Sequence, residues 1–204
     1  MSFLENKNAR PEALAEMALK DEAVLQTVLD GVLSKKDIVR QNSFQALNFL
    51  SEQHPEKLYA KWDFFANLIC SGNAFHKYIA IYIIANLTKA DAENKFEKLF
   101  DAYYALLGDE SVIPAAHVAA NSGKIALAKP KLQAEITNKL LNIDNMVKRH
   151  KDLVKASAIE AFDGYFEKSK DQARIIEFVK TQLNCESPKT RRKAKEFLKK
   201  WNKE

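Results

Sequence analysis

The strongest constraint on the fold of this chain is a residue pattern that recurs along it at nearly constant spacing. In each copy a basic residue comes three positions after a small, acidic or Pro residue and three positions before a small one. Small or apolar residues then stand six, seven and ten positions after the basic residue. Four copies are centred on Arg40, Lys77, Lys155 and Arg191, and Ile113 takes the central position of a weaker copy.

The central residues of successive copies are 37, 36, 42 and 36 residues apart. Spacings of three and four place the small and apolar residues of one copy on the same side of a helix. A fixed period in this range is typical of stacked helical units, because no single unit can bury its apolar side alone. We therefore predict one domain, residues 1–204, in which each repeat pairs a first helix with a second helix that carries the pattern.

Turn-forming residues set the expected bounds of these repeats. The chain has only five Gly and five Pro among 204 residues, most of them between expected helices, which disfavours β-sandwiches and barrels. Pro11 begins a helix over 11–20 that we expect to cap the stack, and residues 1–8 are expected to be a loose end. The repeats are expected at approximately 21–54, 56–88, 95–127, 131–168 and 172–201.

Two of the expected second helices have unusual composition. Residues 74–87 are apolar almost all round, which predicts the most buried helix of the chain. Residues 111–127 are rich in Ala, Ser and Gly, and small residues permit close approach of a neighbouring element. We favour close helix packing over ligand contact as their role, since protein interiors demand such fit.

The cysteines and the apolar stretches bear on the compartment. Cys70 and Cys185 lie far apart and form no CxxC motif, a usage that suits a reducing compartment. No stretch resembles a signal peptide, and the most apolar run, 78–87, is too short for a membrane span. We therefore expect a cytoplasmic protein.

Three segments carry a resemblance to a known family. Asp37-Ile-Val-Arg40, Asp152-Leu-Val-Lys155 and Ser187-Pro-Lys-Thr-Arg191, each followed by small and Leu or Phe positions, resemble the HEAT-repeat signature, and armadillo-like arrays are close to it. The resemblance covers about residues 21–201 and implies an α-solenoid whose second helices line a concave surface. The predicted fold is thus all-α: a right-handed superhelical solenoid of about five antiparallel helix pairs with an N-terminal capping helix.

The recurring basic residues admit two interpretations. They could form a track for nucleic-acid phosphates, or they could bond back to the turn that precedes each second helix, as the resemblance implies. Asp37 and Asp152 lie three positions before Arg40 and Lys155, which favours the second interpretation. Asp37 is also expected to cap its helix by accepting from free N–H groups.

Charge is concentrated in the second half of the sequence. Residues 1–100 have 12 basic and 13 acidic side chains, whereas residues 101–204 have 20 and 14, and 189–204 alone have eight and two. A cationic helix there could serve as a soluble end cap, dock an acidic protein, or hold nucleic acid through counterion release. The sequence leaves these three roles open.

Catalytic motifs are sparse. The four His residues are dispersed, and the sequence contains no HExxH, GxSxG or GxGxxG. Some HEAT-like proteins of about this size are alkylpurine DNA glycosylases, and the basic second half together with Trp62, Tyr78, Tyr82 and Trp201 keeps that alternative open. No Asp with flanking Trp and Arg matches their catalytic site, since Asp63 beside Trp62 falls on an expected first helix.

Our functional prediction is a non-catalytic interaction scaffold that presents a concave helical surface to another protein and uses no cofactor and no metal. The alternative is a nucleic-acid-binding protein that uses the basic C-terminal helix, with an alkylpurine DNA glycosylase-like enzyme as its catalytic form. The candidate contact residues stand just past the central residue of a copy on expected second helices: Gln41, Gln45, Asn48, Tyr78, Tyr82, Asn121, Arg192 and Lys199.

Overall fold

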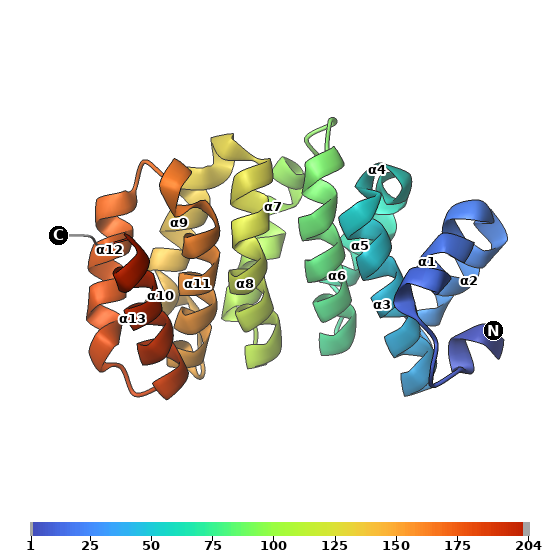
Figure 1. Ribbon diagram of the computed structural model, residues 1–204, viewed down its shortest axis with the longest axis horizontal. Coiled ribbons are helices and arrows are strands. Elements are labelled where there is room, and N and C mark those ends of the chain that lie inside the picture. The colour runs from blue at the N-terminus through green and yellow to red at the C-terminus, as the bar shows by residue number, and fades with distance from the viewer. Residues whose placement is uncertain (1, 202–204) are drawn as a thin grey trace. The chain divides into compact units, whose positions relative to one another are not determined.

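The computed structural model describes residues 2–201 and divides into two compact units, which we call unit 1 (Met1–Phe96) and unit 2 (Glu97–Glu204). Both units are built from helices, and no strand occurs within residues 2–201 (Figure 1). The prediction of an all-α fold is therefore confirmed. The number of helix pairs, the handedness of the superhelix and the assignment of one domain stay predictions.

Unit 1 covers the segments predicted to form the capping helix and the first two repeats. Its helices begin at residues suited to that position: Pro11 and Pro55 stand in first turns, and the side chains of Asp21 and Asn73 accept from the backbone N–H groups of Ala23 and Phe75. The helices are α1 (Pro11–Lys20), α2 (Glu22–Gly31), α3 (Asp37–Gln53), α4 (Pro55–Leu58), α5 (Trp62–Ile69) and α6 (Ala74–Leu87), with short 3₁₀ helices η1 (Ser2–Glu5), η2 (Tyr59–Lys61) and η3 (Thr88–Ala90).

Two details of unit 1 differ from the sequence prediction. The expected loose end is wrong for residues 2–8, because η1 packs on α3, Leu4 is fully buried, and Asn42 donates to the backbone oxygens of Leu4 and Asn6. Residue 1 lies outside the described residues. The first helix of the second repeat is interrupted by η2 rather than continuous. Leu58, Trp62 and Phe65 are nevertheless all buried, so the interruption preserves the apolar side.

The core of unit 1 lies where α6 packs against α3 and α5. Ile79, Ile81, Ile83, Ile84 and Leu87 of α6 are all fully buried, which confirms that this helix is deeply enclosed. Each such side chain contributes roughly 1.5–3 kcal/mol through removal from water. Apolar residues surround most of α6, so its position depends on its packing against both α3 and α5.

Unit 2 covers the segments of the other predicted repeats. Its α-helices are α7 (Lys95–Ala105), which begins at the end of unit 1, α8 (Val112–Ala128), α9 (Gln133–Leu141), α10 (Ile143–Met146), α11 (Lys151–Tyr165), α12 (Gln172–Thr181) and α13 (Pro188–Trp201). The 3₁₀ helices η4 (Leu106–Gly108), η5 (Pro130–Leu132), η6 (Phe166–Lys168) and η7 (Gln182–Asn184) connect them. The second helices stack in order, with α8 against α11 and α11 against α13 (Figure 1).

Small residues bring α8 and α11 unusually close. A Cβ placed on Gly123 of α8 would lie 2.8 Å from the backbone oxygen of Ala161 and 3.1 Å from its Cα. Ala115, Ala119 and Ser122 are also fully buried on α8. Close helix packing is therefore the role of the small residues on this helix, as the sequence predicted.

The recurring basic residues bond to the turn that precedes their own helix. Arg40 donates through Nη1 to the backbone oxygen of Ser34 (2.8 Å) and pairs with Asp37, and Arg191 donates through Nη1 to the backbone oxygens of Cys185 (2.7 Å) and Glu186 (2.8 Å). Lys155 pairs at 2.7 Å with Asp144 of the segment before α11, and at 3.2 Å with Asp152 in the first turn of α11. These contacts confirm the turn-binding interpretation for three of the four residues. The expected cap at Asp37 is wrong, because Asp37 lies inside α3 after the N-cap Lys36 and its carboxylate faces Arg40.

Asp152 also joins one repeat to the next within unit 2. Its Oδ2 accepts from the backbone N–H of Glu186 at 3.1 Å, and its backbone oxygen accepts from the hydroxyl of Thr190. The start of α11 is thereby held against the turn before α13.

None of the helices in the described part of the chain combines the length and the hydropathy that crossing a lipid bilayer requires.

We predict that Gly123→Ala destabilises the protein by roughly 1–3 kcal/mol, because the added methyl forces α8 away from the backbone of α11. The matched control is Gly164→Ala on α11, where an added Cβ meets no atom within 4 Å. That change should stabilise by roughly 0.5–1 kcal/mol, since Gly is a poor helix former. Urea unfolding followed by circular dichroism measures both, and equal effects of the two substitutions would contradict the close packing.

We predict a coupling between Gly31 and Ser43, whose buried Oγ has no hydrogen-bond partner among the described residues. A Cβ on Gly31 would lie 2.1 Å from that Oγ, so Gly31→Ala should cost about 1–3 kcal/mol. Ser43→Ala should be neutral or stabilising, because it removes an unpaired buried hydroxyl, and it should recover part of the Gly31→Ala loss. A double-mutant cycle by urea unfolding tests this, and strict additivity would argue against the coupling.

Candidate functional site

In unit 1 five of the eight predicted contact residues lie on two adjacent second helices. Gln41, Gln45 and Asn48 stand four and three residues apart on α3, and therefore share one side of that helix. Tyr78 and Tyr82 stand four apart on α6, which packs against α3. Gln41 is exposed and the other four side chains are half-buried.

The two tyrosines belong to a cluster of aromatic rings that bridges α3 and α6. The Phe44 ring lies 4.9 Å from that of Tyr78 and 5.8 Å from that of Tyr82, and the two tyrosine rings are 5.0 Å apart. Phe75 continues the row, 5.7 Å from Tyr78, and the guanidinium of Arg40 lies 4.6 Å from the Phe75 ring centroid. Such tilted and edge-on pairs stabilise by about 0.5–1.5 kcal/mol beyond area burial, so each ring holds its neighbours in place.

We call the surface formed by Gln41, Phe44, Gln45, Asn48, Phe75, Tyr78 and Tyr82 the aromatic face. Burial, with a smaller effect of Tyr82, raises the pKa of Tyr78 above its usual 10. Beside this face a shallow groove runs along α3, lined by Pro11, Phe44, Gln45, Asn48, Phe49 and Glu52.

Asn48 also has a structural role. Its Oδ1 accepts from Nδ2 of Asn86 at 3.2 Å, and Asn86 donates to the hydroxyl of Ser51 at 2.9 Å. Asn86 is fully buried on α6, and a buried amide is costly unless its hydrogen bonds are satisfied. The amide oxygen of Asn48 thus accepts a hydrogen bond that helps to hold α3 against α6.

The remaining predicted residues lie in unit 2. Asn121 of α8 is only 2% exposed and donates to the backbone oxygen of His117 at 3.0 Å, so the expectation that it faces outward is wrong. Close packing of α8 encloses it together with the neighbouring small residues. Arg192 and Lys199 of α13 are exposed, and Arg192 lies 3.8 Å from Glu196.

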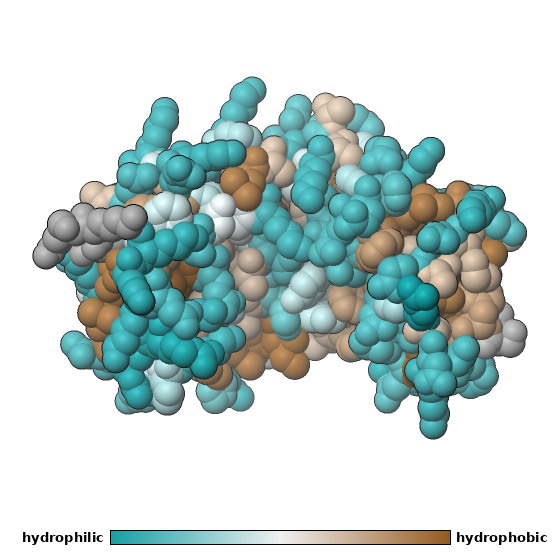
Figure 2. All heavy atoms as spheres, in the orientation of Figure 1, coloured by the Kyte–Doolittle hydropathy of each residue, from teal (hydrophilic) through white to brown (hydrophobic). Residues whose placement is uncertain are grey.

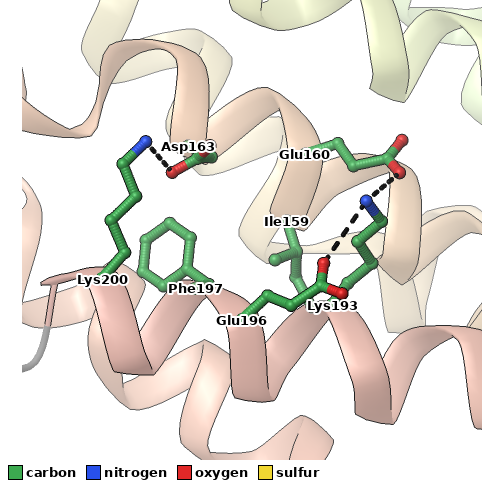
Figure 3. Close-up of a pocket in the computed structure, with 7 residues that line it drawn as sticks. All are labelled: Ile159, Glu160, Asp163, Lys193, Glu196, Phe197 and Lys200. Carbon is green, nitrogen blue, oxygen red and sulfur yellow. Dashed lines mark hydrogen bonds and ion pairs between the residues drawn. The ribbon is translucent and has the colours of Figure 1, made fainter.

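A small hollow between α11 and α13 is lined by ion pairs that link the two helices (Figure 3). Lys193 lies 3.1 Å from Glu160 and 3.5 Å from Glu196, and Lys200 lies 2.8 Å from Asp163. The contact with Glu160 raises the pKa of Lys193. Both lysines therefore serve to attach α13 to α11.

The sequence analysis overlooked Phe44 and Phe75, which complete the aromatic face. Phe44 lies three residues after Gln41, and Phe75 lies three residues before Tyr78. The same helical spacing that selected Gln41 and Tyr78 therefore also indicated these two rings. What the spacing could not show is that the rings of α3 meet those of α6.

No group of three or more His, Cys, Asp or Glu side chains that could hold a metal ion occurs within the described residues. Cys70 is exposed, Cys185 is half-buried, and both are free thiols.

Two solved structures are similar to this chain. One is a designed armadillo repeat protein, with 15% identity, coverage of 97% of this chain and 96% of that chain, and a TM-score of 0.48. The other is described as an engineered protein, with 14% identity, coverage of 98% and 95%, and a TM-score of 0.47. Neither the comparison with protein-family models nor that with curated proteins finds a match.

We predict that His117 contributes to the loss of stability at acid pH. Burial, aided by the charge of Lys189, lowers the pKa of His117 below its usual 6.5. The unfolded chain then binds more protons than the folded one between 6.5 and the lowered pKa, so the free energy of unfolding falls as pH falls through that window. Urea unfolding from pH 7.5 to 5 should show a shallower pH dependence in His117→Asn, and an unchanged slope would contradict this role.

Proposed function

We propose that this protein, an armadillo/HEAT-like helical repeat, binds another protein through the aromatic face of unit 1 and is not itself a catalyst. The observation that carries the proposal is the half-buried Tyr78–Tyr82 pair, held against Phe44 and flanked by three amide side chains. Stacked helices of this class present an extended, rigid surface, and partner binding is the use to which such surfaces are suited.

The chemistry of this face matches that of protein–protein contacts. Tyrosines dominate the energetics of such contacts because each offers a large apolar ring together with a hydroxyl that can donate and accept. Here neighbouring rings already restrain the tyrosines, so binding would order few additional rotatable bonds. Gln41, Gln45 and Asn48 supply donors and acceptors suited to the backbone groups of a partner.

The nucleic-acid alternative receives less support from the recurring basic residues. Arg40, Lys155 and Arg191 donate to turn carbonyls or acidic side chains beside their own helices. A phosphate at any of these positions would have to replace contacts that hold a helix in place. The seven residues that define the aromatic face carry amide and aromatic side chains. The guanidinium of Arg40, which lies over the Phe75 ring, is bound to Ser34 and Asp37, which favours a protein over a polyanion there.

The glycosylase alternative also receives less support from the tryptophans. Trp62 is only 3% exposed within unit 1, and the indole N–H of Trp201 donates to Asp163 at 2.5 Å. Stacking a damaged base on either ring would require Trp62 to leave the core or Trp201 to leave its partner.

We predict that Tyr78→Ala/Tyr82→Ala weakens capture of the partner at least about tenfold, since each anchor of this kind is worth more than about 1 kcal/mol. For the measurement, a photo-crosslinking residue is placed at Gln45 and the captured protein is identified. The purified partner is then titrated against each variant to obtain the binding affinity. The control is Phe178→Ala, which removes a half-buried ring from α12 in unit 2. Thermal melting by circular dichroism verifies that each variant is folded, and equal affinity in both variants would contradict the proposed face.

A further inference from the structure

The charges of α13 are distributed over two flanks of the helix. Lys193 and Lys200 lie on the flank that faces α11, where Glu160 and Asp163 neutralise them (Figure 3). Ile159 and Phe197 fill the space between the two ion pairs. This protein thus joins two consecutive second helices by pairing lysines on the later helix with carboxylates on the earlier one. An apolar contact lies between these pairs.

The other flank of α13 also carries lysines, but no carboxylates of a neighbouring helix pair with them in the described part of the chain. Lys195 and Lys199 stand four residues apart and both are exposed, so their ammonium groups can lie on one side of the helix. Within residues 2–201 the side chain of neither lysine forms a hydrogen bond or an ion pair. Over its whole length α13 has seven basic residues and one acidic residue, a net charge of +6, and its surface is mainly hydrophilic (Figure 2).

The complementary charge is found at the start of unit 1. Residues Pro11–Gly31, which include α1 and α2, have five acidic residues and one basic residue, a net charge of −4. Glu12 and Glu16 stand four residues apart on α1, the same interval as Lys195 and Lys199. The one ion pair of Glu12 is with exposed Arg10 at 3.9 Å, and in the described part of the chain Glu16 forms none. Met17, beside Glu16, is 41% exposed.

We propose that the α13 face of one molecule docks on the α1 face of a second copy of the same chain, with Lys195 and Lys199 opposite Glu12 and Glu16. This contact would repeat, between two molecules, the lysine–carboxylate pairing that joins α11 to α13. Met17 would take the place of the apolar side chains that lie between those ion pairs. The two surfaces are different, so the contact is heterologous. A pair of molecules therefore keeps one unused surface of each kind, and the assembly grows head to tail.

The contact consists of exposed ion pairs, which are individually weak and screened by salt. Association should therefore depend on protein concentration. It should be strongest near 10 mM salt, where the Debye length is about 30 Å, and absent near 1 M salt, where it is about 3 Å.

Charge reversal on each surface provides the test. The tail variant is Lys195→Glu/Lys199→Glu, and the head variant is Glu12→Lys/Glu16→Lys. Sedimentation velocity at low salt should show that the wild-type chain associates and that each variant alone self-associates at least about tenfold more weakly, because it then carries like charges on both surfaces. An equimolar mixture of the two variants should associate again, since the reversed tail meets the reversed head and the unaltered tail meets the unaltered head.

The control is Lys168→Glu/Lys170→Glu, which reverses two exposed lysines that line a hollow with residues of α8 and α9 and changes the net charge by the same amount as the tail variant. It should associate as the wild-type chain does, and melting by circular dichroism confirms that every variant is folded. A wild-type chain that remains monomeric at low salt and high concentration would overturn the proposal, as would a mixture of variants that stays monomeric. Binding of a labelled DNA duplex by monomers through Lys195 and Lys199 would assign this face to nucleic acid and would also overturn it.

Discussion

The contact between successive second helices is the interaction on which the repeats of unit 2 depend. At Gly123 the backbone of α8 comes so near to Ala161 of α11 that no side chain fits between them. Such contact permits dense packing, but only when both helices hold one relative position. The hydrogen bonds that Asp152 forms to the turn before α13 hold the next helix in the same way. Shape and hydrogen bonding at the helix starts together fix the stack.

The same need for fixed helix starts explains why most of the recurring cations are not free for ligands. Arg40 and Arg191 donate to carbonyl oxygens of the preceding turn, which lack partners within the helix. Lys193 and Lys200 are in turn bound to carboxylates on α11. The net charge of +5 for the chain is therefore larger than the charge that its surface offers to a partner. On the other flank of α13, Lys195 and Lys199 are the lysines without such acidic partners among the described residues.

Unit 1 uses its second helices differently. There α3 and α6 meet through aromatic rings and through the hydrogen bonds that buried Asn86 donates to Asn48 and Ser51. Rings that pack edge to face keep part of their surface accessible while their orientation is fixed. Tyr78 and Tyr82 consequently combine restraint with exposure, which is the property that a binding surface requires.

The sequence by itself determined the helical class, the bounds of α1 and α6 and the role of the small residues on α8, because these follow from local spacing and from residue size. It also predicted that Arg40 and Lys155 bond to nearby acids, since those partners lie three residues away. Only the tertiary structure decided that Asn121 is enclosed, that Leu4 is part of the core, and that Phe44 meets Tyr78. Those outcomes depend on contacts between residues far apart in the chain, and the periodicity of a single helix carries no information about which neighbour covers it.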